Sequence, residues 1–158
     1  MTKNAKRLVT LVAAMVMVFA MSITAFAAAP AGTHTTTLRS ASGAIPPHNN
    51  PIVGAEVEYD SDKNETTITL YKDLIVFMGV TGYVEDMTLE GQVGEVLETT
   101  TYTDGETEYP TKVQYTLKGN YSSLPQSFDI AYDVVYITNS GQHRSTTGTL
   151  TIESTVNE

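Results

Sequence analysis

The chain has 158 residues, with 9 basic and 18 acidic side chains and neither Cys nor Trp. The absence of cysteine excludes disulfides, thiolate chemistry, Cys-ligated zinc and iron–sulfur clusters. The formal net charge of −9 argues against a nucleic-acid partner, because phosphate binding requires clustered Lys and Arg side chains. The length allows one ordinary domain.

The first 27 residues have the three-part layout of a secretory signal peptide. Three basic residues precede an almost wholly apolar run over 8–21, and Ala25-Phe26-Ala27 provides a small-x-small cleavage pattern. The run is short for a transmembrane helix, which needs about 20 apolar residues, although an uncleaved anchor is the alternative. We predict cleavage after Ala27 and a mature chain of 28–158 with no membrane span, secreted and free or loosely held at the cell surface.

After the leader, Thr, Val, Ile and Tyr dominate, which favours strands over helices. Stretches with strand character cover His34–Ser40, Ala55–Tyr59, Thr66–Tyr71, Tyr83–Glu90, Glu95–Tyr102, Thr111–Leu117, Ser127–Ile137 and His143–Glu153. The apolar run Leu74–Val80 is either a buried strand or a short helical turn, and we expect Gly82 to end it. The Pro-rich stretch Ser42–Pro51 should be irregular, with at most one helical turn. Seven or eight short strands predict an immunoglobulin-like antiparallel β-sandwich.

The clearest strand is Ser127–Ile137, in which alternate residues share a face. One face carries Phe128, Ile130, Tyr132, Val134 and Tyr136, and the other becomes apolar only at its far end. Tyr132 and Tyr136 point the same way, about 13 Å apart along the strand. This spacing suits two ends of a platform for a flat ligand; alternatively, both are ordinary sheet-face residues.

No motif indicates catalysis, so we predict that the protein is not an enzyme. The chain has no Gly-x-Ser-x-Gly, no His-x-x-x-His pair and no glycine-rich phosphate loop. Carboxylates are abundant, which keeps a small extracellular hydrolase as an alternative. Asp60-x-Asp62-x-Asn64 resembles the start of a calcium loop, but Glu65 stands where such a loop needs Gly, so a hairpin turn is the better interpretation.

A series of segments carries a resemblance to a known family. The segments are Ser40–Ile45, Asn50-Pro51 leading into Ala55–Tyr59, Thr66–Leu70, Gly82-Tyr83-Val84, Tyr109-Pro110 leading into Val113–Leu117, and the closing hairpin Phe128–Ile152. In this order they resemble the NEAT (near-iron transporter) domain, an immunoglobulin-like sandwich of Gram-positive surfaces, over about residues 33–154. The resemblance implies one NEAT-like domain over 28–158 and a part in bacterial iron acquisition, because the family binds haem or haem-carrying proteins.

The resemblance also implies where haem would lie: between a helical turn after the first strand and the last hairpin. In the family, a Tyr-x-x-x-Tyr motif at that hairpin supplies a tyrosinate to the iron. Here the matching letters, Tyr132 to Tyr136, lie before the turn, and Asn139 stands at the position of the usual ligand. The implied slot residues are Ile45, Met78, Tyr132, Val134, Tyr136 and His143. Of these, His143 is the candidate ligand to the haem iron.

Two functions outside catalysis follow from these observations. The first is a secreted binding domain for haem or another tetrapyrrole. The alternative is a cell-surface interaction or structural sandwich that has lost the haem site. In that case its strand edges or Pro-rich segment would contact a bacterial surface protein, and its acidic charge would favour a basic partner.

Overall fold

The computed structural model describes residues 29–138 and 142–158, which form ten strands and contain no helix. The predicted signal peptide, residues 1–27, lies outside the described residues. The strands are β1 (His34–Ser40), β2 (Ile52–Asp60), β3 (Glu65–Lys72), β4 (Ile75–Phe77), β5 (Val80–Leu89), β6 (Gln92–Val93), β7 (Glu95–Thr101), β8 (Glu108–Lys118), β9 (Gln126–Tyr136) and β10 (Gln142–Val156). Within this part of the chain, no helix is long and apolar enough to cross a bilayer.

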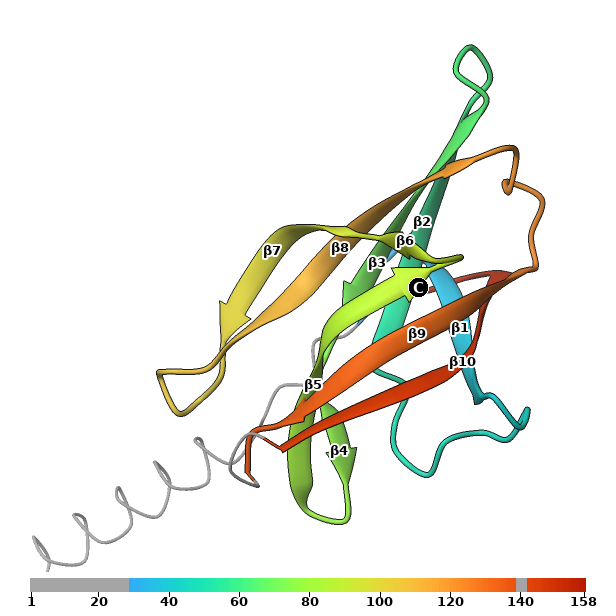
Figure 1. The fold of residues 1–158 in the computed structure, drawn as a ribbon. Helices are drawn as coiled ribbons and strands as arrows, with labels where there is room; N and C mark the ends of the chain where they lie inside the picture. The colour runs from blue at the N-terminus through green and yellow to red at the C-terminus, as the bar shows by residue number, and fades with distance from the viewer. Residues whose placement is uncertain (1–28, 139–141) are drawn as a thin grey trace, which may run out of the picture.

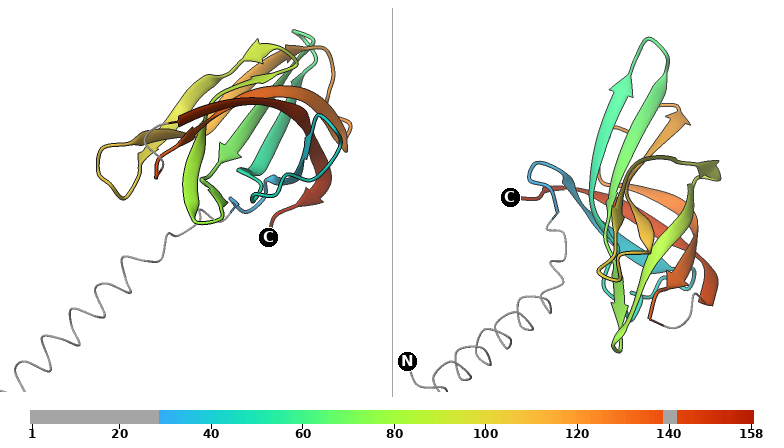
Figure 2. Two further views of the ribbon diagram at one scale, coloured as in Figure 1. Left: turned by 60° about the horizontal axis from the view of Figure 1, so that its bottom comes forward. Right: turned by 90° about the vertical axis from the view of Figure 1, so that its left-hand side faces the viewer.

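The strands belong to one antiparallel sheet that folds back on itself into two layers (Figure 1; Figure 2). One layer contains β2, β3, β8 and β7, and the other contains β4, β5, β9, β10 and β1, with β6 paired to β5. The layers are joined through β1 and β2, whose ladder pairs His34 with Ala55. The predicted antiparallel β-sandwich is confirmed, but the described residues form ten strands rather than seven or eight.

The additional strands include a hairpin formed by the apolar run Leu74–Val80. A tight turn divides this run at Met78 and Gly79, whose φ angles are 49° and 80°, so β4 pairs back on the start of β5. The expectation that Gly82 ends the run is wrong, because this glycine lies inside β5. A Cβ at Gly82 would stand 2.7 Å from the carbonyl oxygen of Val135, so glycine is what allows β5 and β9 to approach there.

The main core lies between the layers, because alternate side chains of each strand point inward. On β9, Phe128, Ile130, Tyr132 and Val134 are all buried, as the period of two predicts. Full burial of one such apolar side chain contributes roughly 1.5–3 kcal/mol. The core contains Leu38, Ile52, Ala55, Ile68, Leu70, Ile75, Val84, Met87, Leu89, Val113, Tyr115, Leu117, Phe128, Ile130, Tyr132, Val134, Leu150 and Ile152.

A second, smaller apolar cluster forms on the other face of β5 and β9. Tyr83 and Val135 are ladder partners, and they point to the face opposite that of the neighbouring core residues. Tyr109 of β8 packs on Tyr83 with ring centroids 5.9 Å apart, and Leu74 completes the buried set. The β7–β8 hairpin is therefore held against β5 as well as against β3.

The Pro-rich stretch is irregular, as expected, and it contains no helical turn. Residues 41–51 connect β1 to β2 as a loop. Asn49 fixes this loop, because its side chain donates to the carbonyl of Leu74 at 2.8 Å and accepts the N–H of Val76 at 2.7 Å. The helical turn implied by the family resemblance is therefore not formed in this segment.

Candidate functional site

Three of the six residues proposed to line a haem slot lie on the inner face of β9. Tyr132 and Val134 belong to the buried core, and Tyr136 is half-buried against it. The period of two places them on the face that carries Phe128 and Ile130, and the opposite layer covers this face. These side chains therefore fill the interior of the sandwich instead of bordering an open slot.

The surroundings of Tyr132 also work against a role as an iron ligand. Burial raises the pKa of Tyr132, and the charge of Tyr136 acts in the same direction, while Arg144 opposes them. Ferric iron is bound by a phenolate, and a raised pKa increases the cost of removing the proton that such binding requires. Asn139, at the position of the usual family ligand, lies outside the described residues.

The other three residues lie on separate parts of the surface. Ile45 is exposed in the loop between β1 and β2, and Met78 is 87% exposed at the turn between β4 and β5. His143 pairs with Val135 in the β9–β10 ladder, so its side chain lies on the outer face, where its Nδ1 is 3.5 Å from Oε2 of Glu85. The structure does not bring the six residues together at one surface.

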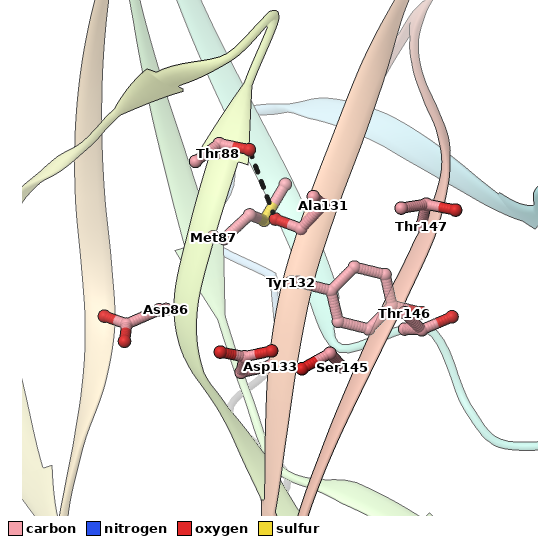
Figure 3. Close-up of a pocket in the computed structure, with 9 residues that line it drawn as sticks. All are labelled: Asp86, Met87, Thr88, Ala131, Tyr132, Asp133, Ser145, Thr146 and Thr147. Atoms are coloured by element: carbon pink, nitrogen blue, oxygen red, sulfur yellow. Dashed lines mark hydrogen bonds between the residues drawn. The ribbon is translucent and has the colours of Figure 1, made fainter.

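A groove does cross the outer face of β5, β9 and β10, and Figure 3 shows one half of it. Two adjoining cavities of about 490 and 480 Å³ form it, and both are lined by Thr88, Ala131 and Thr147. We call this surface the outer groove. Its outward-facing side chains are Asp86, Thr88, Asp129, Ala131, Asp133, Ser145, Thr147 and Thr149.

The ladder register explains why a groove forms at this place. Ala131 on β9 lies between Thr88 of β5 and Thr147 of β10, so a row of short side chains crosses the three strands. Asp129 and Asp133 stand two residues to either side of Ala131 and point the same way. Because the side chain of Ala131 is a single methyl group, the face is hollow between the two carboxylates.

An irregularity in β5 supplies a third carboxylate. The register of β5 against β9 shifts between Val84 and Met87, and Asp86 lies within this shift. In Figure 3, Asp86 projects from the side of β5 away from β9. Asp133 lies on the opposite side of β5, at β9 and near Ser145. Carboxylates therefore stand on both sides of β5.

The groove is acidic and rich in hydroxyl groups. Three aspartates line it together with several Thr residues and Ser145, and no Lys or Arg of the described chain lines either half. Its backbone is held in place, since Glu90 Oε1 accepts the N–H of Asp129 at 2.7 Å. Thr88 Oγ1 donates to the carbonyl of Ala131 at 3.5 Å. Such a surface can accept hydrogen bonds and attract positive charge.

The described residues that line the groove include no histidine, so Ser145 has no imidazole beside it to act as a base. Across the described residues, no group of three or more His, Cys, Asp or Glu side chains is placed to hold a metal ion.

No motif in the sequence singled out the groove residues. Their signal was the alternation Asp129, Ala131, Asp133 on the second face of the predicted strand. Acidic and small residues in alternation are also typical of any strand face that is exposed to solvent. The pattern therefore did not reveal that Thr88 and Thr147 would stand on either side of Ala131.

Comparison with family models, with curated proteins and with solved structures found no match to this chain.

Proposed function

We propose that this chain is a secreted, non-catalytic protein-binding module whose outer groove accepts an extended, basic segment of a partner protein. The observation that carries the proposal is the charge of the groove: Asp86, Asp129 and Asp133 line it, and no basic side chain among the described residues does. Secretion rests on the predicted signal peptide. This choice corresponds to the interaction domain predicted as the alternative to haem binding.

The spacing of the carboxylates indicates the form of the ligand. Asp129 and Asp133 are four residues apart on one strand, which corresponds to about 13 Å. Basic side chains four residues apart on another extended chain have the same spacing. The methyl group of Ala131 leaves room for the ligand backbone between them, and the nearby hydroxyls supply hydrogen-bond partners.

The charge of the whole domain favours the same partner. Three of the nine basic residues lie in the predicted leader, so the mature chain has 6 basic and 18 acidic residues and a net charge of −12. Such a field accelerates encounter with a positively charged partner. Each exposed ion pair is worth roughly 0.2–1 kcal/mol, so we expect weak, salt-sensitive binding that depends on several contacts.

A labelled peptide tests the proposal directly. The probe is a ten-residue Thr/Ser peptide with Lys at positions 3 and 7, and fluorescence anisotropy with residues 28–158 measures its affinity at low ionic strength. We expect saturable binding that weakens on addition of 0.5 M NaCl. The double substitution Asp129→Asn and Asp133→Asn should weaken it about tenfold, because two charge contacts are lost.

Matched controls separate this site from general charge attraction. Asp62→Asn removes a carboxylate from the exposed β2–β3 turn and should leave the affinity unchanged. Ala131→Arg, which fills the floor of the groove, should abolish binding. Equal binding by a peptide with Glu in place of Lys, or equal losses with Asp62→Asn and the groove variants, would contradict the proposal. A saturable Soret shift that is lost in His143→Ala would support haem binding instead.

A further inference from the structure

A further cavity lies where the two layers meet along their open side. In the described chain, β5 pairs with β4, β6 and β9, and β8 pairs with β3 and β7, so no ladder joins β5 to β8. The hydroxyl of Tyr115 on β8 donates to the carbonyl of Met87 on β5 at 3.1 Å. Beside this contact, a cavity of about 380 Å³ opens between the layers. We call it the seam cavity.

The seam cavity is lined by one buried cation, Lys72. The alternation of β3 turns Lys72 to the same inward face as Ile68 and Leu70, and its side chain is 3% exposed. Among the described residues its amine has neither a hydrogen bond nor an ion pair. Burial lowers the pKa of Lys72 to about 8, and the charge of Asp86 opposes this shift.

The Lys72 side chain is almost fully removed from solvent, and a charged amine in such surroundings is unfavourable, so it favours a ligand that can pair with it. Taking a charged group out of water costs several kcal/mol unless an opposite charge and hydrogen bonds compensate. A carboxylate entering the seam cavity would supply both. The amine of Lys72 is therefore the position at which an acidic group of a ligand would be held.

The other residues that line the cavity indicate which further chemical groups the ligand should have. Apolar side chains of Met87, Val96 and Val113 form walls, and Val93, which is 82% exposed, adds an apolar side chain at the mouth. Asp86 also lines the cavity and is exposed to solvent. The lining thus combines a buried positive group, an apolar wall and a negative group close to water.

We propose that the seam cavity binds a small apolar amino acid. The carboxylate of the ligand pairs with the amine of Lys72, its ammonium group faces Asp86, and its apolar side chain packs against Val96 and Val113. The cavity volume is within the range of roughly 300–1,000 Å³ that is usual for small-molecule sites. This site shares Asp86, Met87 and Thr88 with the outer groove, but Lys72 lines only the seam cavity, so Lys72→Met tests the site without changing a groove residue.

Three related probes distinguish the parts of the ligand. L-leucine carries both charged groups, 4-methylpentanoate lacks the amine, and 3-methylbutylamine lacks the carboxylate. Titration of residues 28–158 with each probe, followed by NMR of the valine methyl groups, should give saturable shifts at Val96 and Val113 with leucine. The shifts should be weaker with 4-methylpentanoate and absent with 3-methylbutylamine, because only a carboxylate pairs with Lys72.

Two variants assign the roles of the charged residues. Lys72→Met should abolish leucine binding, whereas Lys118→Met, which changes an exposed amine outside the cavity, should not. Asp86→Asn should weaken leucine at least fivefold and leave 4-methylpentanoate equal or tighter, since a carboxylate that repels the ligand is removed. Near-UV circular dichroism of the tyrosines verifies that each variant is folded.

A proton measurement gives an independent readout. The titratable groups that line the cavity with Lys72 are Glu85 and Asp86 on β5 and Tyr115 on β8. At pH 8, calorimetry of leucine binding in buffers of different ionisation enthalpy should show uptake of a fraction of a proton, because a bound carboxylate favours the ammonium form. Unsaturated shifts up to 20 mM leucine, or unchanged binding in Lys72→Met, would overturn the proposal.

Discussion

The side chain of Lys72 is directed inward by the alternation of β3, which also directs Ile68 and Leu70 to the interior. A lysine on such a face loses hydration that its neighbours do not need. The cost appears in its pKa, which burial lowers to about 8 from a usual value of about 10.4. The folded state therefore holds this proton less tightly than the unfolded chain does.

This difference predicts how stability changes with pH. As the pH rises through about 8 towards 10.4, the unfolded chain still binds the proton that folded Lys72 has lost, so the folded state gains stability. We expect a gain of about 2 kcal/mol between pH 7 and pH 9.5. Lys72→Met should lack this gain and should be the more stable protein at pH 7.

Urea denaturation of both proteins at several pH values measures the effect. The difference between them is the informative quantity, because the remaining titratable groups are shared. If the free energies of unfolding of the two proteins run parallel from pH 7 to pH 9.5, the amine is not desolvated as described.

At the scale of strands, close approach of backbones decides where glycine is required. Gly148 of β10 pairs with Ser40 of β1, and a Cβ at this position would collide with the backbone carbonyl of Arg39. Backbone atoms cannot turn aside as a flexible side chain can. The β1–β10 pairing is therefore sensitive to the size of the residue at position 148. Because β1 also pairs with β2, a disturbance of this ladder would reach the junction between the two layers.

Gly148→Ala should destabilise the domain by about 1–3 kcal/mol, the usual effect of inserting a methyl group where there is no room. Ser154→Ala, on the same strand but exposed, should change stability by less than about 0.5 kcal/mol. Thermal unfolding of the two variants beside the unchanged protein compares them. If Gly148→Ala and the unchanged protein had equal melting temperatures, β1 would be able to move away from β10 without loss of stability.

At the scale of the whole molecule, the important feature is that the rolled sheet formed by the described residues does not close. Its order ends at β4 and β7, and every residue of β7 is exposed. The β7–β8 hairpin also projects beyond the rest of the sandwich (Figure 1). A free edge can pair with another chain, and proteins commonly protect such edges with charged side chains. Glu95 and Glu98 occupy β7 beside the exposed Val96 and Leu97.

Removal of these charges should promote association through the edge. The double substitution Glu95→Gln and Glu98→Gln keeps side-chain size while removing repulsion between copies, so we expect dimers or larger species at concentrations where the unchanged protein is monodisperse. Sedimentation velocity measures the distribution. Glu106→Gln, in the turn between β7 and β8, and Glu108→Gln, at the start of β8, form the control pair. Identical sedimentation of both double variants would argue against protection by β7 carboxylates.

The sequence by itself determined most strand positions, because alternation and turn residues act locally. Ser127–Ile137 shows this well, since its Phe128 face is the buried face of β9. The run Leu74–Val80 was ambiguous, because its one turn signal is Gly79, and a single glycine inside an apolar run also fits a continuous strand. Family resemblance then placed Tyr132 and Val134 at a ligand slot, where the structure has core.

Tertiary structure alone decided which faces form the outer groove and the seam cavity. Ala131 acquires its neighbours Thr88 and Thr147 from strands that are distant in sequence, and Lys72 comes to face Asp86 across the seam between layers. Periodicity reports which side chains share a face of one strand, but not which strand lies beside it or what covers it. Those properties arise from long-range pairing, which no local pattern encodes.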